Sequence, residues 1–170
     1  MIYTERVLQR SKQNWQRIAL FITLGMSVAA LGLPVSASAA TKQLYLTPGS
    51  TIVSPNSTIT VDVRANPGTP IDAVEATIAY NPSFFKYLST DTTGSVFPVE
   101  LPTTTTSTSV TVTRGIFLPD TVKSDSLVAR VTFKVLARTT VTTLKLTGNM
   151  TYQGAYVTPT TASTTVRIQN

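Results

Sequence analysis

The sequence predicts an all-β protein, a jelly-roll β-sandwich of about nine strands that follows an N-terminal signal peptide. Three observations support this prediction. Beyond residue 39, apolar side chains alternate with polar ones in short runs, as in half-buried strands. Proline, glycine, asparagine and serine separate these runs. Thirty of the residues beyond position 39 are threonine, a β-branched type that suits a pleated and partly exposed surface.

Residues 1–39 have the three parts of a secretory signal peptide. Four basic residues and one acid occupy positions 1–17, an apolar run covers 18–35, and Ala37 and Ala39 supply the small residues of a cleavage site. The apolar run is close to the ~17–25 residues that span a membrane, so an uncleaved anchor is the alternative. We expect residues 40–170 to form one folded domain that is extracellular or on the cell surface.

The composition of residues 40–170 excludes several classes of protein. The leader holds four of the 14 Lys and Arg residues and one of the eight acids, so the net charge of the remainder falls from +6 to +3. This small surplus, without basic clusters, gives no basis for nucleic-acid binding. The chain has no cysteine, so disulfides cannot stabilise it. It has no histidine, which removes the commonest general base and metal ligand.

Two strands are expected before the first long break in the pattern. Residues 43–47 place two leucines on one side and end at a Pro-Gly-Ser turn. Residues 58–65 alternate more regularly. The side chains expected to face inward from this second strand are Ile59, Val61, Val63 and Ala65. The sequence Asn-Pro-Gly-Thr-Pro at 66–70 then interrupts the pattern.

The stretch 71–88 is expected to be the centre of the core. Apolar residues follow one another at a spacing of two up to Tyr80, and Asn81-Pro82-Ser83 then predicts a turn, because proline cannot continue a strand ladder. A second apolar run covers 84–88. The aromatic side chains expected in the core are Tyr80, Phe84, Phe85 and Phe133.

The rest of the chain continues in short alternating segments. Residues 96–101 contain a proline and predict either an edge strand or a loop that covers the core. The Thr- and Ser-rich residues 103–109 predict a loop or the entry to a strand. A short piece at 150–152 is bracketed by two glycine-containing turn signals. The clear strands expected in this part cover 110–117, 126–136, 141–147 and 162–169.

Three segments, in this order, resemble the cohesin domain family. The first is Thr58–Arg64 with the Pro/Gly loop after it. In the second, Ala73–Leu88, the sequence Tyr-Asn-Pro-Ser-Phe-Phe resembles the family's strand, Tyr-Asp-Pro turn and following leucine. The third is Leu127–Leu146, where Leu-Val-Ala-Arg-Val-Thr-Phe-Lys-Val resembles a cohesin strand with its partner. Asn81 and Phe85 depart from the family's usual Asp and Leu, but both preserve the turn and the apolar plug.

The resemblance implies a nine-stranded jelly roll and a protein partner. Cohesin domains bind the dockerin domains of polysaccharide-degrading enzymes, and cohesin-like domains also occur on bacterial surfaces. We therefore expect an exported, non-catalytic module whose partner is a dockerin-like domain or a surface protein. The link to polysaccharide degradation is an expectation from the family. No binding residue is transferred, because dockerin recognition varies between cohesin types.

The acidic residues give no motif for catalysis. A glycosidase requires two facing carboxylates, and no local pattern pairs any of these acids. Asp120 and Asp125 share one loop, but their spacing matches no EF-hand-type calcium site, so a solvated loop is expected instead of a metal site. No cofactor is expected. The acids beyond the leader are Asp62, Asp72, Glu75, Asp91, Glu100, Asp120 and Asp125.

Two further functions remain as alternatives to protein binding. A carbohydrate-binding module shares the fold and would bind polysaccharide through exposed aromatic rings. Its candidate residues are Tyr152 and Tyr156, which lie four apart in a loop-rich stretch, although packing beneath that loop competes with this role. The third hypothesis is a threonine-rich structural subunit of the cell surface that joins other copies edge to edge.

Overall fold

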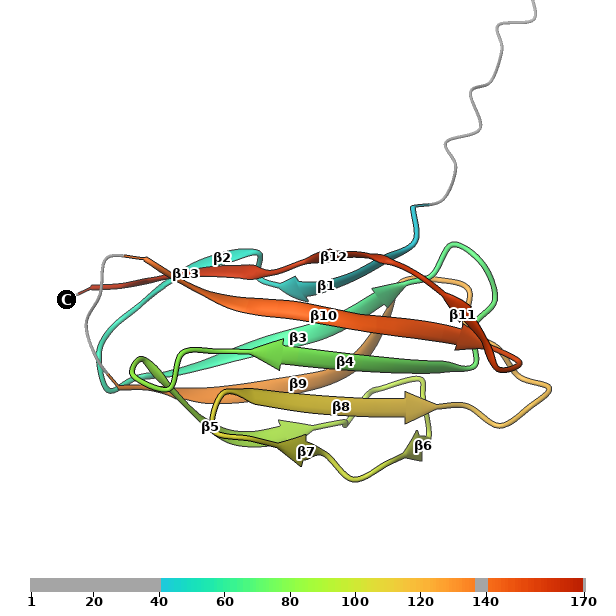
Figure 1. Ribbon diagram of the computed structural model, residues 1–170, viewed down its shortest axis with the longest axis horizontal. Coiled ribbons are helices and arrows are strands. Elements are labelled where there is room, and N and C mark those ends of the chain that lie inside the picture. The colour runs from blue at the N-terminus through green and yellow to red at the C-terminus, as the bar shows by residue number, and fades with distance from the viewer. Residues whose placement is uncertain (1–40, 137–140, 170) are drawn as a thin grey trace, which may run out of the picture. The chain divides into compact units, whose positions relative to one another are not determined.

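The computed structural model describes residues 41–136 and 141–169, and within them the chain forms 13 strands in two sheets and no helix (Figure 1). The all-β sandwich is therefore confirmed, with more strands than the sequence predicted. The predicted leader at 1–39 lies outside the described residues. None of the described residues belongs to a helix that could cross a membrane.

The smaller sheet has five strands in the order β12-β1-β3-β9-β5. All of its pairs are antiparallel except β1 with β12. A bulge interrupts the β5–β9 ladder between Tyr87 and Ser89. The strands are β1 (Gln43–Thr47), β3 (Thr58–Asn66), β5 (Phe85–Asp91), β9 (Ser126–Val135) and β12 (Thr160–Ala162).

The larger sheet has eight strands, six of them in the order β2-β13-β10-β4-β8-β6. Strand β11 pairs with β10, and β7 pairs with β8. Only β2 and β13 run parallel. The strands are β2 (Ser50–Val53), β4 (Ala73–Ala79), β6 (Val99–Glu100), β7 (Thr104–Thr105), β8 (Ser109–Gly115), β10 (Thr142–Tyr152), β11 (Ala155–Val157) and β13 (Thr164–Ile168).

The core lies between the sheets and is centred where the sequence predicted it. Phe133 of β9 is fully buried and packs edge-on against three aromatic rings of the stretch 71–88. The ring centroids of Tyr80, Phe85 and Tyr87 lie 5.1, 6.2 and 6.3 Å from that of Phe133. The inward side chains predicted for 58–65 are all buried. Phe84 is only partly buried and packs against this core.

The turn between β4 and β5 is held by Asn81. Its backbone carbonyl accepts hydrogen bonds from the N–H groups of Phe84 and Phe85, both at 3.0 Å. Its side-chain oxygen accepts a third, from the N–H of Ser83 at 2.9 Å. Asparagine and aspartate both offer this side-chain oxygen, so the substitution preserves the turn.

The predicted break near Gly148 is wrong, because β10 runs without interruption from Thr142 to Tyr152. A Cβ atom on Gly148 would lie 2.2 Å from the backbone oxygen of Glu75 and 2.7 Å from Cδ2 of Leu44. Glycine is present here because neighbouring strands approach closely, which a sequence cannot distinguish from a turn signal. The segment 150–152 is therefore the end of β10.

The segment 96–101 combines both predicted roles. Val99 and Glu100 form the short edge strand β6, and Phe97 is fully buried beneath the loop that precedes it. Arg114 of β8 is also buried and holds this loop from below. Its guanidinium donates to the carbonyl oxygen of Phe97 at 2.5 Å and lies 2.7 Å from the carboxylate of Glu100.

Several strand limits differ from the sequence expectation. The strand predicted at 110–117 is β8 and ends at Gly115, which leaves Phe117 71 % exposed in the following loop. The edge strands β2, β7, β11 and β12 were not predicted as separate strands. Each has only two to four residues, so none is long enough for the period-two alternation that identifies a strand to be recognised.

Candidate binding surfaces

One outer face of the sandwich is lined mainly by threonine. In β10, β4 and β8 every second residue is buried, and the strand register aligns the outward residues in rows. The central row joins Thr147, Thr77 and Thr111, and the last two share a hydrogen bond of 2.8 Å between their hydroxyls. We call this surface the threonine face: Thr143, Lys145, Thr147, Asn149 and Thr151; Ala73, Glu75, Thr77 and Ala79; Ser109, Thr111 and Thr113.

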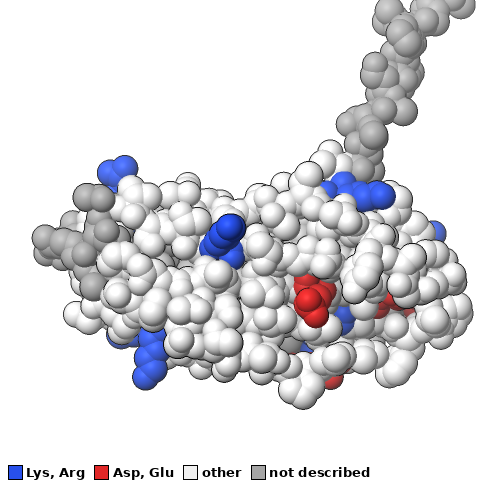
Figure 2. Space-filling view, viewed as in Figure 1, with Lys and Arg blue, Asp and Glu red and all other residues white. Residues whose placement is uncertain are grey.

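The threonine face carries little charge. It holds one acid, Glu75, and one base, Lys145, and neither belongs to an ion pair among residues 41–136 and 141–169. In Figure 1 the strands β10, β4 and β8 lie in front of β3 and β9, and Figure 2 shows the same view with few coloured side chains. Short hydroxyl side chains on adjacent strands leave this surface even and weakly charged.

The opposite outer face differs because its arginines pair with carboxylates. Arg130 of β9 lies 3.5 Å from the carboxylate of Asp62 and 3.6 Å from that of Asp91. Arg64 of β3 lies 3.3 Å from Asp125. The arginine pairs therefore lie on this face, and most of the ordered threonine rows lie on the other.

Hydrogen bonds shift the pKa of two groups on the outer face of the smaller sheet. The backbone N–H of Thr93 donates to Asp91 at 2.9 Å and, together with the Thr93 hydroxyl and Arg130, holds the pKa of Asp91 below its ordinary value. Burial raises the pKa of Tyr45, and the hydrogen bond that Tyr45 donates to Asp125 at 2.8 Å raises this pKa further. These groups already satisfy one another, so a partner would have to displace existing bonds.

The structure places the two candidate tyrosines on the β10–β11 hairpin. Its two-residue turn has positive φ at both Gln153 and Gly154. The register sets Tyr156 opposite Thr151 and Tyr152 opposite Ala155. Opposed residues share a face and successive residues alternate, so the two tyrosines lie on opposite faces of the hairpin. A role for them in sugar binding stays a prediction, and the two rings do not form one flat platform.

Tyr156 borders a small depression at the edge of the threonine face. Its side chain is 76 % exposed, and the depression of about 180 Å³ is also lined by Glu75, Thr113, Asn149 and Thr151. This site combines an aromatic ring with a carboxylate, an amide and two hydroxyls. Alternation of polar and apolar residues gave the outward direction of these side chains, but not that β8, β4 and β10 would bring them together.

Asp72 holds the hairpin that carries Tyr156. Its carboxylate accepts hydrogen bonds from the hydroxyl of Thr151 at 3.1 Å and from the backbone N–H of Gln153. Its own N–H donates to the carbonyl of Thr151 at 2.8 Å. The carboxylate thus ties the start of β4 to the turn of the hairpin.

The remaining acids do not form a recognisable catalytic pair. Asp62 and Asp91 flank Arg130, Glu100 pairs with Arg114, and Asp125 pairs with Arg64. Asp125 forms an ion pair with Arg64 and accepts a hydrogen bond from Tyr45, so it does not form an isolated carboxylate pair with Asp120. Across the part of the chain that the structure describes, no three Asp or Glu residues gather closely enough to hold a metal ion.

Comparison with known proteins shows which family the chain is similar to. The sequence model of the cohesin domain matches residues 44–168, which span the domain from β1 to the end of β13. A search of curated proteins finds no match.

Solved cohesin structures share the fold at low sequence identity. The sixth cohesin of scaffoldin B from Acetivibrio cellulolyticus, solved with a Cel5 dockerin mutant, is 14% identical with a TM-score of 0.65, covering 76% of this chain and 99% of that one. A non-cellulosomal cohesin from Archaeoglobus fulgidus is 18% identical with a TM-score of 0.63, covering 77% and 93%. The OlpA cohesin from Clostridium thermocellum, solved with the dockerin Doc918, is 15% identical with a TM-score of 0.63, covering 76% and 99%.

Proposed function

The chain belongs to the cohesin domain family, and on this premise we propose that its β-sandwich is a non-catalytic module that binds a protein partner of the dockerin type. Two of the similar cohesins were solved with dockerins, which supports a partner of this class. We further propose that the module acts outside the cell, where the partner would be carried by a polysaccharide-degrading enzyme or by a surface protein.

The threonine face is the observation that carries this proposal. The centres of protein interfaces are depleted in charged residues, and this face holds only Glu75 and Lys145. Its competitor, the outer face of β3 and β9, would first have to give up the ion pairs of Arg130 and Arg64. Desolvating charges that are already paired costs free energy that an even hydroxyl surface does not.

The size of the face suits the centre of an interface. Residues 143–151 of β10 span roughly 30 Å, and the three strands β10, β4 and β8 span roughly 14 Å. The face therefore offers about 400 Å² in projection, about half of the ~800 Å² of accessible surface that each partner buries in a standard interface, so the partner would also contact residues around the face. Short hydroxyls lose little rotamer freedom on binding and both donate and accept hydrogen bonds.

Calorimetric titration of the domain with dockerin domains from the same genome tests the proposal. Two matched variants distinguish the faces, because both outer faces carry a threonine pair joined across strands. Thr77 bonds Thr111 at 2.8 Å on the threonine face, and Thr60 bonds Thr132 at 2.9 Å on the other. We expect Thr111→Arg to weaken binding at least tenfold and Thr132→Arg to change it less than twofold. Absence of binding to every dockerin tested, or the reverse order of the variants, would contradict the proposal.

A second candidate function is polysaccharide binding at the depression beside Tyr156. Its support is the combination of an exposed ring with Glu75 and Asn149 at hydrogen-bonding positions on one surface. Sugars bind through aromatic faces together with such polar groups. Retardation in polysaccharide-affinity gels that is lost in Tyr156→Ala, and kept in Tyr152→Ala, would favour this function over the first.

The structural-subunit hypothesis has less support. Edge-to-edge assembly requires an open edge strand, and β5 is the last strand of its sheet. The bulge at Tyr87/Ser89 limits the regular part of this edge to residues 85–87, and the exposed Lys86 would meet the same positive charge on another copy. Concentration-dependent assembly in sedimentation experiments would restore this hypothesis.

A further inference from the structure

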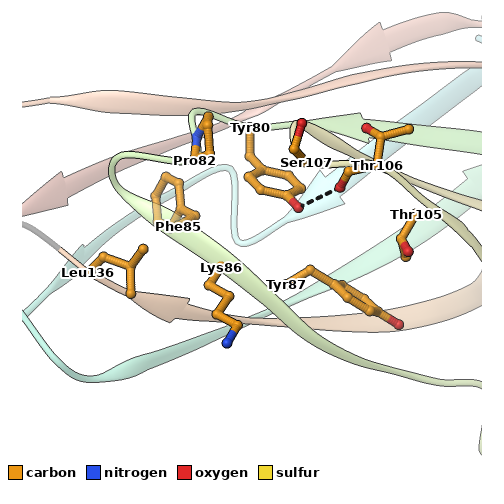
Figure 3. A pocket seen from close by; sticks show the side chains of 9 residues that line it. All are labelled: Tyr80, Pro82, Phe85, Lys86, Tyr87, Thr105, Thr106, Ser107 and Leu136. Carbon is orange, nitrogen blue, oxygen red and sulfur yellow. Dashed lines mark hydrogen bonds between the residues drawn. The ribbon is translucent and has the colours of Figure 1, made fainter.

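A groove runs along the flank of the sandwich, between β5 of one sheet and the β7–β8 hairpin of the other. It has a volume of about 370 Å³. Its lining combines the aromatic rings of Tyr80, Phe85 and Tyr87 and the side chain of Leu136 with the hydroxyls of Thr105 and Ser107 (Figure 3). This groove is separate from the threonine face, which is the outer surface of β10, β4 and β8.

The aromatic floor of the groove is rigid. Tyr80, Phe85 and Tyr87 all pack edge-on against the buried ring of Phe133. The hydroxyl of Tyr80 also donates a hydrogen bond of 3.2 Å to the carbonyl oxygen of Thr106, which is the dashed line in Figure 3. This bond ties the floor to the opposite wall, so the groove exists before any ligand enters. Preformed apolar clefts with a few polar groups are typical binding sites.

One wall of the groove is a strand edge. Within the described residues β5 pairs only with β9, so the other side of its backbone faces the groove without a strand partner. The bulge after Tyr87 restricts a regular edge to the first three residues, 85–87. An extended peptide can pair with so short an edge and place one side chain in the floor.

The charge beside the groove is positive and unbalanced. Lys86, which lines the groove, lies directly opposite Lys134 of β9, and like charges in this position destabilise a sheet. Among the described residues neither lysine has a carboxylate partner, although the Lys134 ammonium donates to the carbonyl of Asn56. On the face seen in Figure 2, the left end of the domain, where β5 begins in Figure 1, carries blue side chains and no red ones.

The neighbouring acids do not compensate this charge. Asp62 and Asp91 both belong to the register row of Arg130, which is four residues from Lys134 along β9 and so roughly 13 Å away. Both already pair with Arg130. The two lysines therefore present a free positive site next to an apolar floor and an open strand edge.

We propose that the groove binds an extended acidic segment of a protein partner, which adds to the edge of β5 and inserts one aromatic or aliphatic side chain between Tyr80, Tyr87 and Leu136. The acidic residues on either side of that side chain face Lys86 and Lys134. Each of the three features selects one property of the ligand. The strand edge selects an extended backbone, the aromatic floor binds an apolar side chain, and the lysine pair selects acidic neighbours of that side chain. A sugar or a bare polyanion would use only one of them.

Fluorescence polarisation tests this inference with the intact domain. The probe is a labelled ten-residue peptide of alternating glutamate and threonine with a central phenylalanine. We expect saturable binding that weakens at least fivefold in Lys86→Glu and in Leu136→Ala, and at least tenfold when sodium chloride rises from 50 to 300 mM, on the order of the salt dependence of several ion contacts. The matched control is Lys123→Glu, which reverses an exposed lysine in the β8–β9 loop and should leave binding within twofold.

Three results would overturn the proposal. The first is no saturation at millimolar protein, and the second is equal binding of a peptide in which lysine replaces glutamate. The third is that polyphosphate, or the same peptide with threonine in place of phenylalanine, binds as tightly, because the site would then be a sequence-independent polyanion surface. Lys86 and Leu136 are both exposed, so their variants should keep the thermal unfolding of the parent, and this measurement excludes misfolding as the cause of lost binding.

Discussion

Replacing Gly148 by alanine tests how closely the strands approach at the centre of the larger sheet. The added Cβ would lie 2.2 Å from the backbone oxygen of Glu75, 2.7 Å from Cδ2 of Leu44 and 3.1 Å from the Cα of Ala76. The leucine side chain can move, but the two backbone atoms belong to β4, which pairs with β10 over seven residues. Relief of the contact therefore requires a shift of one strand relative to the other.

The expected cost follows from two opposing terms. Alanine lowers the entropy of the unfolded chain and by itself stabilises a protein by about 0.4–1 kcal/mol. Overpacking of a rigid core costs about 1–3 kcal/mol, and each ladder hydrogen bond that is weakened adds up to about 1 kcal/mol. We expect Gly148→Ala to lower the free energy of unfolding by about 2–4 kcal/mol, because the added Cβ would contact backbone atoms of β4, which cannot move away as a side chain can.

Urea denaturation followed by circular dichroism measures this change. With a slope of about 1.5–2 kcal/mol/M for a domain of this size, a loss of 3 kcal/mol moves the midpoint down by roughly 1.5–2 M. The matched control is Gly49→Ala, since nothing lies within 4 Å of a Cβ at Gly49. That variant should stay within about 1 kcal/mol of the parent. A Gly148→Ala variant as stable as the Gly49→Ala variant would refute the close approach of β4 and β10.

Three further predictions concern the loop, the hairpin and the charged face. Phe97→Ala should cost about 3–5 kcal/mol, measured by urea denaturation, because a fully buried ring leaves a cavity under the β6 loop; a loss below 1 kcal/mol would contradict this packing. Asp72→Ala should speed proteolytic cleavage at the Gln153 turn more than tenfold while the rest of the domain resists, and uniform cleavage would argue against a local tie. The pKa of Asp91 is lowered on folding, so its stabilising effect is present above the ordinary carboxylate pKa of 3.8 and is lost as the pH falls through the folded value. Asp91→Asn should therefore be less stable than the parent near pH 6 and equal to it near pH 2, as followed by thermal unfolding, and a difference that persists at low pH would contradict this assignment.

The centre of the fold was accessible from the sequence because its signal is local. Apolar residues at a spacing of two up to Tyr80, followed by Asn81-Pro82, indicate a buried strand and its turn without knowledge of neighbouring strands. The run that contains Phe133 does the same for β9. The structure adds that these two segments meet, with ring centroids of Tyr80 and Phe133 5.1 Å apart.

The parts that sequence analysis missed depend on contacts between distant segments. Gly148 looks like a turn residue until β4 and Leu44 are placed beside it. Phe117 continues an apolar run but lies beyond the last ladder pair of β8, so it is exposed. The edge strands β2 and β12 are defined by partners far away in the chain instead of by their own pattern.

The sequence predicts which threonines of the candidate binding surface point outward, but not which of them lie on the same face. Alternation shows that Thr77, Thr111 and Thr147 point outward, and the same holds for Thr60 and Thr132. Only the order β10-β4-β8 collects the first three in one row, while Thr60 and Thr132 belong to the face with the arginine pairs. Strand order is a property of the whole fold, so the local pattern could not assign the faces.

Lysine labelling of the complex with its protein partner tests the central claim most directly. Lys145 is the one lysine on the threonine face, Lys42 precedes β1 of the smaller sheet, and both are exposed. If the threonine face binds the partner, an amine-reactive reagent read by mass spectrometry should modify Lys145 at least fivefold more slowly in the complex and Lys42 at an unchanged rate. Protection of Lys42 with Lys145 unprotected would contradict the account.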